Sequence, residues 1–305
     1  MHLSAISIGY AVPAEDFDAS VHSAFQSALN LRLIGEEGLL TLIASEEGDL
    51  PQGIRLDLPE GFSFEEFQTG ERAVCRDGVL HFENSPLAVQ LNEARRWKCD
   101  LPALEFDPKN PVVAAAWSLV WEALNRRQRR MESEIVAEDL FRSSTPVLKD
   151  ISQRVSEAMH DLLLATRRYE LTDAAAVASL IGLGPGLTPS GDDILIGYMA
   201  GLWCTVQARS ERAQYISSLG ERIIHLSHQT NDISRTYLYH AVGGQISSRL
   251  ANLAEAICRG ADPGSLHETA ETAMSIGHTS GMDTVSGLLV GLGAWEGNQL
   301  KNSLE

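Results

Sequence analysis

Residues 182–193 read Gly182-Leu-Gly-Pro-Gly-Leu-Thr-Pro-Ser-Gly-Asp-Asp193 and lead directly into the apolar segment Ile-Leu-Ile-Gly-Tyr-Met-Ala-Gly-Leu202. A related stretch, Gly277-His-Thr-Ser-Gly-Met-Asp283, leads into Thr-Val-Ser-Gly-Leu-Leu-Val-Gly-Leu292. In both stretches a polar turn precedes an apolar helix with glycines at matching positions. The sequence therefore predicts a pseudo-repeated motif of glycine turn and helix, with two helix N-termini that serve one purpose.

The glycines inside these two helices predict how the helices pack. Gly197, Gly201, Gly287 and Gly291 each cost about 1 kcal/mol relative to alanine in a helix interior. Their sum, about 4 kcal/mol, is large beside net stabilities of about 5–15 kcal/mol. Backbone-to-backbone packing of the two helices would offset this cost. Such packing would bring both turns to one end of the pair, and we expect a shared, pseudo-symmetric site there.

The rest of the chain predicts an α+β fold. Alternating apolar and polar residues from Ile54 to Leu58 indicate a half-buried strand, and residues 28–33 and 39–44 are further strand candidates. Asp77-Gly78 predicts a hairpin turn between residues 72–76 and 79–82. From residue 112 the apolar period is helical. We predict a β-rich N-terminal domain over 1–108 and a mainly α-helical C-terminal domain over 109–305, which carries both motifs.

Composition and charge limit the classes of partner. The chain has 305 residues, 44% of them hydrophobic, with a formal net charge of -17, so a broad nucleic-acid contact would be repulsive. Four scattered cysteines without a CxxC pair fit a reducing compartment and argue against a zinc site. Neither a membrane span nor a leader segment is recognisable. We expect a cytoplasmic protein that binds no nucleic acid and no membrane.

The two turns predict a binding site for a small anion. Glycines allow positive φ and close backbone approach, and the unpaired N–H groups of a helix N-terminus attract phosphate or carboxylate. The spacing matches neither the dinucleotide fingerprint nor a P-loop. A plain structural turn fits the first motif equally well. The candidate substrate-binding residues in the turns are Gly184, Gly186, Thr188, Ser190, Gly191, Thr279, Ser280 and Gly281.

Three aspartates in the motifs have two interpretations. Asp193 and Asp283 each follow a serine by three positions, which is the capping-box pattern, whereas the second motif has Met282 in place of Asp192. Alternatively, carboxylates beside a bound phosphate would need a divalent cation such as Mg²⁺ between them and the anion. We favour the capping interpretation, and we expect no cofactor and no metal.

Three basic residues complete the candidate site. His278 precedes the second turn and could donate to an anion or act as an acid or base near neutral pH, although a capping or core role fits as well. Arg235, between Ser234 and Thr236, could clamp a planar carboxylate or phosphate, or lie on a solvated helix face. Arg32 is the N-terminal cation we would test first, with a surface strand charge as the alternative. His278 and Arg235 are the candidate catalytic residues.

The run Gly184-Pro-Gly-Leu-Thr-Pro-Ser-Gly-Asp-Asp193, the later Leu238-Tyr-His-Ala-Val-Gly243 and Gly277-His-Thr-Ser-Gly-Met-Asp283 together resemble the AllH-type family. The resemblance is strong over about residues 180–295, weaker from Phe25 to Leu42, and faint in between. The family includes the AllH subunit of bacterial oxamate carbamoyltransferase, which acts in anaerobic allantoin breakdown. The resemblance brings no established catalytic residue with it.

The resemblance implies phosphorolysis of oxalurate to oxamate and carbamoyl phosphate, or the reverse carbamoylation, as part of purine catabolism. It also implies an assembly with an FdrA-type subunit, which is acyl-CoA-synthetase-like, and an AllG-type subunit. The usual carbamoyltransferase signatures, Ser-x-Arg-Thr and His-Pro-x-Gln, are absent from the sequence. Two alternatives therefore stay open: a non-catalytic assembly subunit, and a metal-dependent phosphate-handling enzyme that uses Asp192, Asp193 and Asp283.

Overall fold

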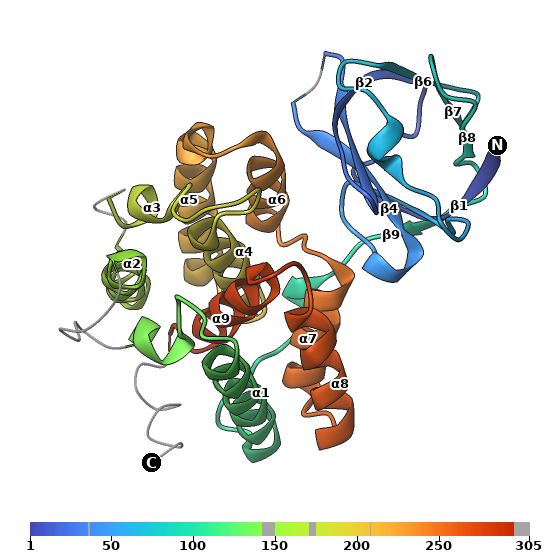
Figure 1. Cartoon of the computed structure of the whole chain (residues 1–305). Coiled ribbons are helices and arrows are strands. Elements are labelled where there is room, and N and C mark those ends of the chain that lie inside the picture. The colour runs from blue at the N-terminus through green and yellow to red at the C-terminus, as the bar shows by residue number, and fades with distance from the viewer. Residues whose placement is uncertain (36, 142–149, 171–174, 208, 296–305) are drawn as a thin grey trace. The chain divides into compact units, whose positions relative to one another are not determined.

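The computed structural model describes residues 1–35, 37–141, 150–170, 175–207 and 209–295. The chain folds into two compact units, Met1–Cys99 and Asp100–Glu305. Figure 1 shows strands in the first unit and helices in the second, so the predicted α+β class is confirmed at this level. The domain boundary after residue 108 stays a prediction.

The N-terminal unit is built on one nine-stranded sheet. Its strand order is β5-β4-β3-β2-β6-β7-β8-β1-β9, and an additional antiparallel pairing of β1 with β5 closes it. Most neighbouring pairs are antiparallel, whereas β1–β8, β1–β9 and β4–β5 are parallel. The strands are β1 His2–Gly9, β2 Phe17–Ala24, β3 Ala28–Leu33, β4 Leu39–Ala44, β5 Gly53–Leu56, β6 Arg72–Arg76, β7 Val79–Phe82, β8 Ala88–Gln90 and β9 Arg95–Trp97.

The strand pattern of the sequence is visible in burial. The expected strands at residues 28–33, 39–44, 72–76 and 79–82 are β3, β4, β6 and β7. Between β6 and β7 the turn residues Asp77 and Gly78 have φ values of 50° and 73°, which confirms the predicted hairpin. Leu29, Leu31, Leu42, Ile54 and Leu56 are fully buried in the core of this unit.

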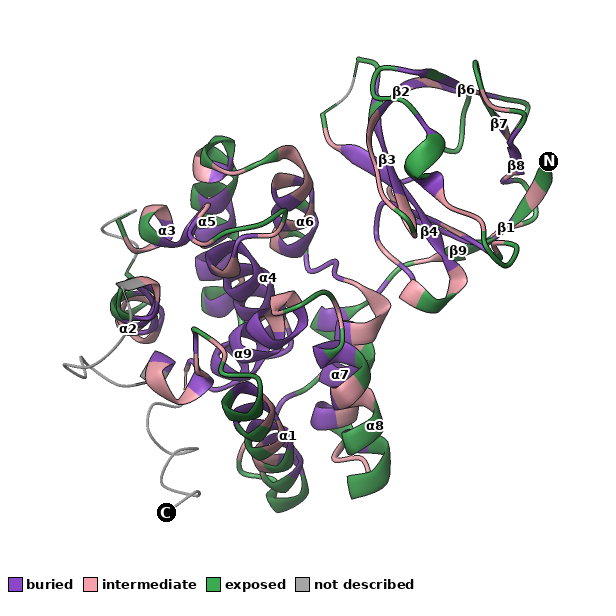
Figure 2. Cartoon of the chain, viewed as in Figure 1, coloured by how far each residue is buried: buried purple, intermediate pink, exposed green. Residues whose placement is uncertain are grey.

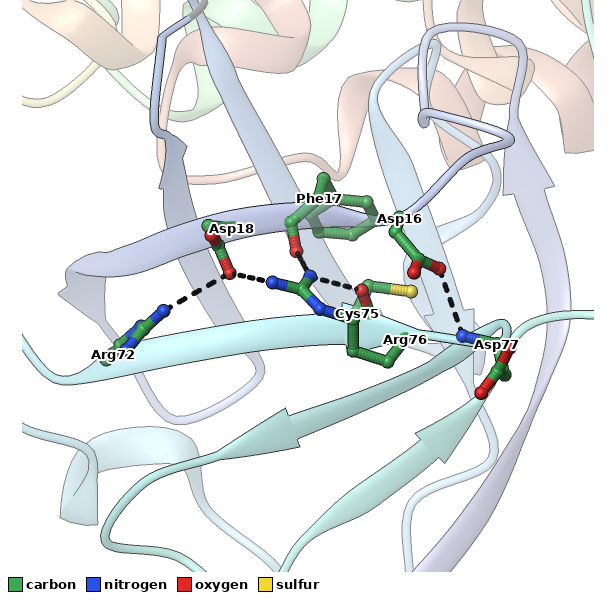
Figure 3. Close-up of polar contacts among 7 residues, drawn as sticks. All are labelled: Asp16, Phe17, Asp18, Arg72, Cys75, Arg76 and Asp77. Atoms are coloured by element: carbon green, nitrogen blue, oxygen red, sulfur yellow. Dashed lines mark hydrogen bonds and ion pairs between the residues drawn. The ribbon is translucent and has the colours of Figure 1, made fainter.

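An ion pair fastens β2 to β6 on the surface of the N-terminal unit (Figure 3). Asp18 Oδ1 lies 2.8 Å from Arg76 Nη2 and 3.6 Å from Arg72 Nη2. Arg76 also donates to the carbonyl oxygens of Phe17 and Cys75. Because these side chains are partly exposed, the pairs contribute little to stability, about 0–1 kcal/mol each, and the cluster is structural.

The second unit is helical. A turn of 3-10 helix at Leu101–Ala103 precedes the first long helix. The helical period expected from residue 112 onward is confirmed by α1, which begins at Pro111 and ends at Arg130. The helices are α1 Pro111–Arg130, α2 Asp150–Arg168, α3 Ala175–Leu180, α4 Ser190–Trp203, α5 Ser210–Leu226, α6 Asp232–Val242, α7 Ser248–Arg259, α8 Pro263–Met274 and α9 Ser280–Leu292.

Helices α4 and α9 form the centre of this unit, as the purple ribbons in Figure 2 show. Every residue of α4 from Gly191 to Leu202 is buried, which explains why its sequence after Asp193 is apolar on all sides rather than amphipathic. Helix α1 packs on α9, and Trp117 donates from Nε1 to the carbonyl oxygen of Leu289 at 3.0 Å. Among the helices that the structure describes, none has the length and apolar character needed to cross a membrane.

Candidate functional site

The backbones of α4 and α9 touch at their glycines. A Cβ atom placed on Gly197 would lie 1.9 Å from the carbonyl oxygen of Thr284, and one on Gly287 would lie 2.1 Å from that of Ile194. Both distances are far below any real carbon–oxygen contact, so only glycine fits at these positions. The predicted backbone-to-backbone packing of the two helices is confirmed. Gly201 and Gly291 are similarly close to the other helix. A Cβ atom placed on Gly201 or Gly291 would lie 2.5 or 2.4 Å, respectively, from the nearest backbone oxygen.

The turns before these helices line one pocket of about 310 Å³. This volume lies at the small end of the range for ligand pockets, about 300–1,000 Å³. Six of the predicted binding or catalytic residues contribute to its wall, three from each turn. The lining residues are Ser133, Glu134, Ile135, Pro185, Gly186, Leu187, Thr188, Ser190, His278, Thr279, Ser280 and Asp283.

Three of the predicted glycines are not among the pocket-lining residues but shape the turns. Gly191 and Gly281 sit against backbone, because a Cβ atom would lie 2.0 Å from Leu180 O and 2.5 Å from Ala273 O. Gly184 has a φ of 114°, which L-residues rarely adopt. These glycines therefore have a steric reason to be glycine that involves no ligand, and their role in substrate binding stays a prediction.

Hydroxyl groups connect the two turns directly. Thr188 Oγ1 lies 2.6 Å from Ser280 Oγ, within hydrogen-bonding distance. Asp193 on α4 is hydrogen-bonded to Thr188 of its own turn and to Ser280 of the other. Asp283 on α9 is likewise hydrogen-bonded to Thr279 of its own turn and to Ser190 of the other. The two acids thus make matching contacts across the helix pair.

These contacts correct the capping interpretation of the two acids. Helix α4 begins at Ser190, so its N-cap residue is Pro189, which has no N–H group for Asp193 to accept. The N-cap residue of α9 is Thr279, and in neither helix does the N-cap side chain make a capping hydrogen bond within the described part of the chain. The capping-box prediction is therefore wrong, because Ser190 and Ser280 are the first residues of their helices rather than the N-cap residues.

Burial makes both acids unusually weak. Desolvation raises the pKa of Asp283 to about 7, with Glu134 adding a smaller repulsion. Desolvation also raises the pKa of Asp193 well above its ordinary range, and the nearby Asp283 raises it further. In both carboxyl groups the Oδ2 atom is buried and has no hydrogen-bond partner among the residues that the structure describes. Buried polar atoms of this kind normally have a hydrogen-bond partner, and for these two oxygens the described residues do not supply one.

Asp192 has a structural role beside the pocket. Its carboxylate accepts hydrogen bonds from the backbone N–H of Gly182 at 2.9 Å, from Thr230 Oγ1 at 2.5 Å and from Ser234 Oγ at 2.7 Å. Desolvation raises its pKa, and the three donors oppose that shift. Asp192 therefore fixes the glycine turn to the start of α6. Ser234, predicted to belong to an anion clamp, instead donates to this carboxylate.

Neither predicted arginine is part of the pocket wall. Arg235 lies on α6, where its Nη2 pairs with Asp232 Oδ1 at 2.5 Å. Arg32 is an exposed residue of β3 in the N-terminal unit. His278, in contrast, lines the pocket next to Thr279. Of the cations chosen from the sequence, the structure brings only His278 to the two turns within the described residues.

One wall of the pocket is formed by residues that no sequence motif indicated. Ser133, Glu134 and Ile135 come from the segment after α1 and contain no motif. They reach the site through the packing of α1 on α9, which residue spacing cannot reveal.

The proposed metal ligands do not gather, because the described residues contain no group of three histidine, cysteine or acidic side chains placed to hold a metal ion.

Comparison with known families agrees with the resemblance seen in the motifs. Residues 180–292, which contain both turns and both central helices, match the family described as oxamate carbamoyltransferase subunit AllH. Residues 4–96 match the AllH family N-terminal domain. No solved structure matches the chain significantly. With both parts matched, this chain belongs to the AllH family, whose name describes a subunit of oxamate carbamoyltransferase.

Proposed function

We propose that this chain is the component of an oxamate carbamoyltransferase-like enzyme that binds a small phosphorylated or carboxylate anion at the N-termini of α4 and α9. The reaction is the conversion of oxalurate and phosphate to oxamate and carbamoyl phosphate in allantoin and purine catabolism. The observation that supports it best is the pocket that both turns line. The family described as an oxamate carbamoyltransferase subunit supplies the class of reaction.

The chemistry of the pocket wall suits an anion. Thr188, Ser190, Thr279 and Ser280 supply hydroxyl groups there. The N–H groups of Gly191 and Gly281 already donate to the carbonyl oxygens of Leu183 and Ile276, so these hydroxyl groups are the main donors on the wall. The positive ends of the two helix dipoles also favour negative charge there. Gly186 adds backbone without a side chain, and nothing lies within 4 Å of where its Cβ would be. An oxyanion would therefore find several donors and little steric obstruction.

The reaction requires these donors where charge develops. A phosphate oxygen attacks the carbamoyl carbon of oxalurate, and the bond from that carbon to the amide nitrogen breaks. The nitrogen takes up the proton that the phosphate gives up, which leaves oxamate and carbamoyl phosphate. Hydrogen-bond donors fixed around the phosphate stabilise the charge as it moves. His278 would assist as donor or proton carrier, and Arg235 would assist only if it left Asp232.

The proposal includes partners. A chain of a family named as a subunit works with other subunits. We propose an FdrA-type and an AllG-type subunit as those partners, and a cytoplasmic location for the assembly. We further propose that the two turns act as one pseudo-symmetric site, which the matching contacts of Asp193 and Asp283 support.

Binding of carbamoyl phosphate to a Gly186→Val variant tests the site. Gly186 has a φ of 99°, so valine would force the turn into another conformation without a steric clash. We expect loss of binding at least tenfold, with circular dichroism unchanged. Gly70→Val is the matched control, because Gly70 has a φ of 88° and equally open surroundings but does not line the pocket. Unchanged binding by Gly186→Val would contradict the proposal.

Two further comparisons separate the alternatives. Carbamoyl phosphate formation is measured with the chain alone and with the FdrA-type and AllG-type subunits added. If Gly186→Val leaves the rate of the full assembly unchanged, the chain is an assembly subunit rather than a substrate-binding one. Binding is then repeated with a chelator and with Mg²⁺. Binding that needs Mg²⁺ would favour the metal-dependent enzyme, whereas we expect no effect of either addition.

A further inference from the structure

Each of the two buried acids between the turns has a carboxyl oxygen without a partner. Asp193 Oδ2 and Asp283 Oδ2 are buried and accept no hydrogen bond from the residues that the structure describes. Next to Asp193, Thr188 Oγ1 and Ser280 Oγ lie 2.6 Å apart and share a hydrogen bond with each other. A charged carboxylate oxygen is costly to bury without a donor, so these surroundings favour a protonated acid.

Asp283 extends the same arrangement to the wall of the pocket. Ser190 and Thr279 are hydrogen-bonded to this carboxyl group, whose Oδ2 is buried and without a partner among the described residues. Only 3% of Asp283 is exposed, yet the residue lines the pocket. A buried carboxylate oxygen without a donor is costly, whereas a carboxylic acid can turn its own proton toward a ligand.

The charges that act on the two acids all favour an added proton. Asp192 acts on Asp193, and Glu134 acts on Asp283, and both are negative. The neighbouring helices α6 and α1 add neutral side chains rather than charges. Ser234 of α6 donates to Asp192, and Gln128 of α1 donates to Ser286 of α9. His278 is the basic side chain on the pocket wall.

We propose that Asp193 and Asp283 form one proton-binding carboxyl pair, through which the pocket binds an oxyanion together with a proton. Asp283 then offers a neutral carboxylic acid as hydrogen-bond donor to a phosphate or carboxylate oxygen. One proton enters from solvent with the anion and leaves with it, and no covalent bond changes. This inference rests on the proposed function only in requiring that an oxyanion binds in this pocket.

Proton uptake during binding of inorganic phosphate tests the pair. Calorimetric titrations at pH 8, in two buffers of different ionisation enthalpy, give the number of protons taken up. Asp283→Asn keeps a neutral donor of the same shape but cannot titrate. Any proton that phosphate itself gains or loses on binding contributes equally for the wild-type protein and the variant. We therefore expect the wild-type protein to take up close to one proton more than Asp283→Asn. Asp193→Asn should lose the uptake as well, and serves if the first variant does not fold.

The pH dependence gives a magnitude. If only the protonated pair binds, affinity falls in proportion to the protonated fraction. For a group with a pKa of about 7, that fraction falls about 50-fold between pH 7 and pH 9. The affinity of the wild-type protein relative to Asp283→Asn should therefore fall about 50-fold over this range. Glu122→Gln is the control, because Glu122 is an exposed acid of α1 that does not line this pocket, and its loss should leave proton uptake in place.

Three outcomes decide the inference. Extra uptake that is lost in both asparagine variants supports the pair. Equal uptake by wild type and Asp283→Asn, with phosphate bound in both, overturns it and leaves the proposed function standing. If phosphate does not bind the wild-type protein, the proposed function fails, and infrared spectroscopy of the protein alone judges the pair. A protonated-carboxyl band at pH 6 that Asp283→Asn reduces then supports the pair, and its absence overturns it.

Discussion

Replacing Gly197 by alanine should separate the two central helices. The new Cβ would lie 1.9 Å from the carbonyl oxygen of Thr284 and 2.7 Å from the backbone nitrogen of Leu288. An acceptable contact requires a separation of at least about 3 Å, so the backbones must move apart by about 1 Å or more. Both sides of the contact are helix backbone, which cannot rotate away as a side chain would.

The magnitude follows from two opposing effects. Alanine in a helix interior is favoured over glycine by about 1 kcal/mol. Overpacking of a buried contact costs about 1–3 kcal/mol and more where nothing can yield. Because a shift of two buried helices also loosens their other neighbours, the cost lies at the upper end of this range, and we expect a net loss of about 2 kcal/mol in the free energy of unfolding. Phosphate binding should weaken too, since Ser190 and Ser280 begin the displaced helices.

Urea unfolding, followed by the helical circular dichroism signal, measures this loss. Gly243→Ala is the matched control, because its φ is -84° and the nearest atom to the new Cβ is 3.5 Å away. It should change the free energy of unfolding by less than about 0.5 kcal/mol. Gly287→Ala opens the same gap, so the double variant should lose less than the sum of the two. A Gly197→Ala protein as stable as the control would refute the reasoning.

Three further predictions concern buried titratable groups. Asp192→Ala removes the acceptor of three hydrogen bonds and should cost about 3 kcal/mol of unfolding free energy, measured by urea unfolding. Burial raises the pKa of Asp283 from 3.8 to about 7, so the native state holds a proton that the unfolded state releases. The free energy of unfolding therefore falls as pH rises between these two values. Asp283→Asn should be more stable than the wild-type protein at pH 8, by at most about 4 kcal/mol. Burial lowers the pKa of His240 from 6.5 to about 4, so stability falls as pH drops through this window; His240→Gln should lose that dependence, worth about 3 kcal/mol, in unfolding midpoints between pH 7 and pH 4. Curves of stability against pH that match the wild-type protein in slope would contradict the last two.

Local sequence signals predicted much of the fold. Alternation of apolar residues identified β5, and the Asp77-Gly78 turn identified the β6–β7 hairpin, because each depends on neighbours along the chain. The glycines of α4 and α9 predicted a close helix pair, because four glycines in two buried helices need a steric reason. Strands β1 and β9 gave no comparable signal. Their parallel pairing joins segments far apart in the sequence, and no local pattern encodes it.

The candidate site was predictable where it depended on the turns and unpredictable where it depended on their pairing. The hydroxyl residues of both turns could be chosen from the sequence, because the first residues of a helix lie at its N-terminal end. The glycines had already predicted that the N-terminal ends of these two helices meet. That Asp193 and Asp283 contact hydroxyl groups across the helix pair depends on the register of α4 against α9. The capping-box pattern therefore indicated the wrong partners. Glu134 entered the site through tertiary packing alone.

The central claim is that one anion binds between the N-termini of α4 and α9. A crystal structure of the protein soaked with phosphate tests it most directly. We predict phosphate within hydrogen-bonding distance of Thr188 or Ser190 of the first turn and of Thr279 or Ser280 of the second, with Asp283 close enough to donate to it. Phosphate bound at one turn alone, or elsewhere in the protein with this pocket empty, would contradict the account.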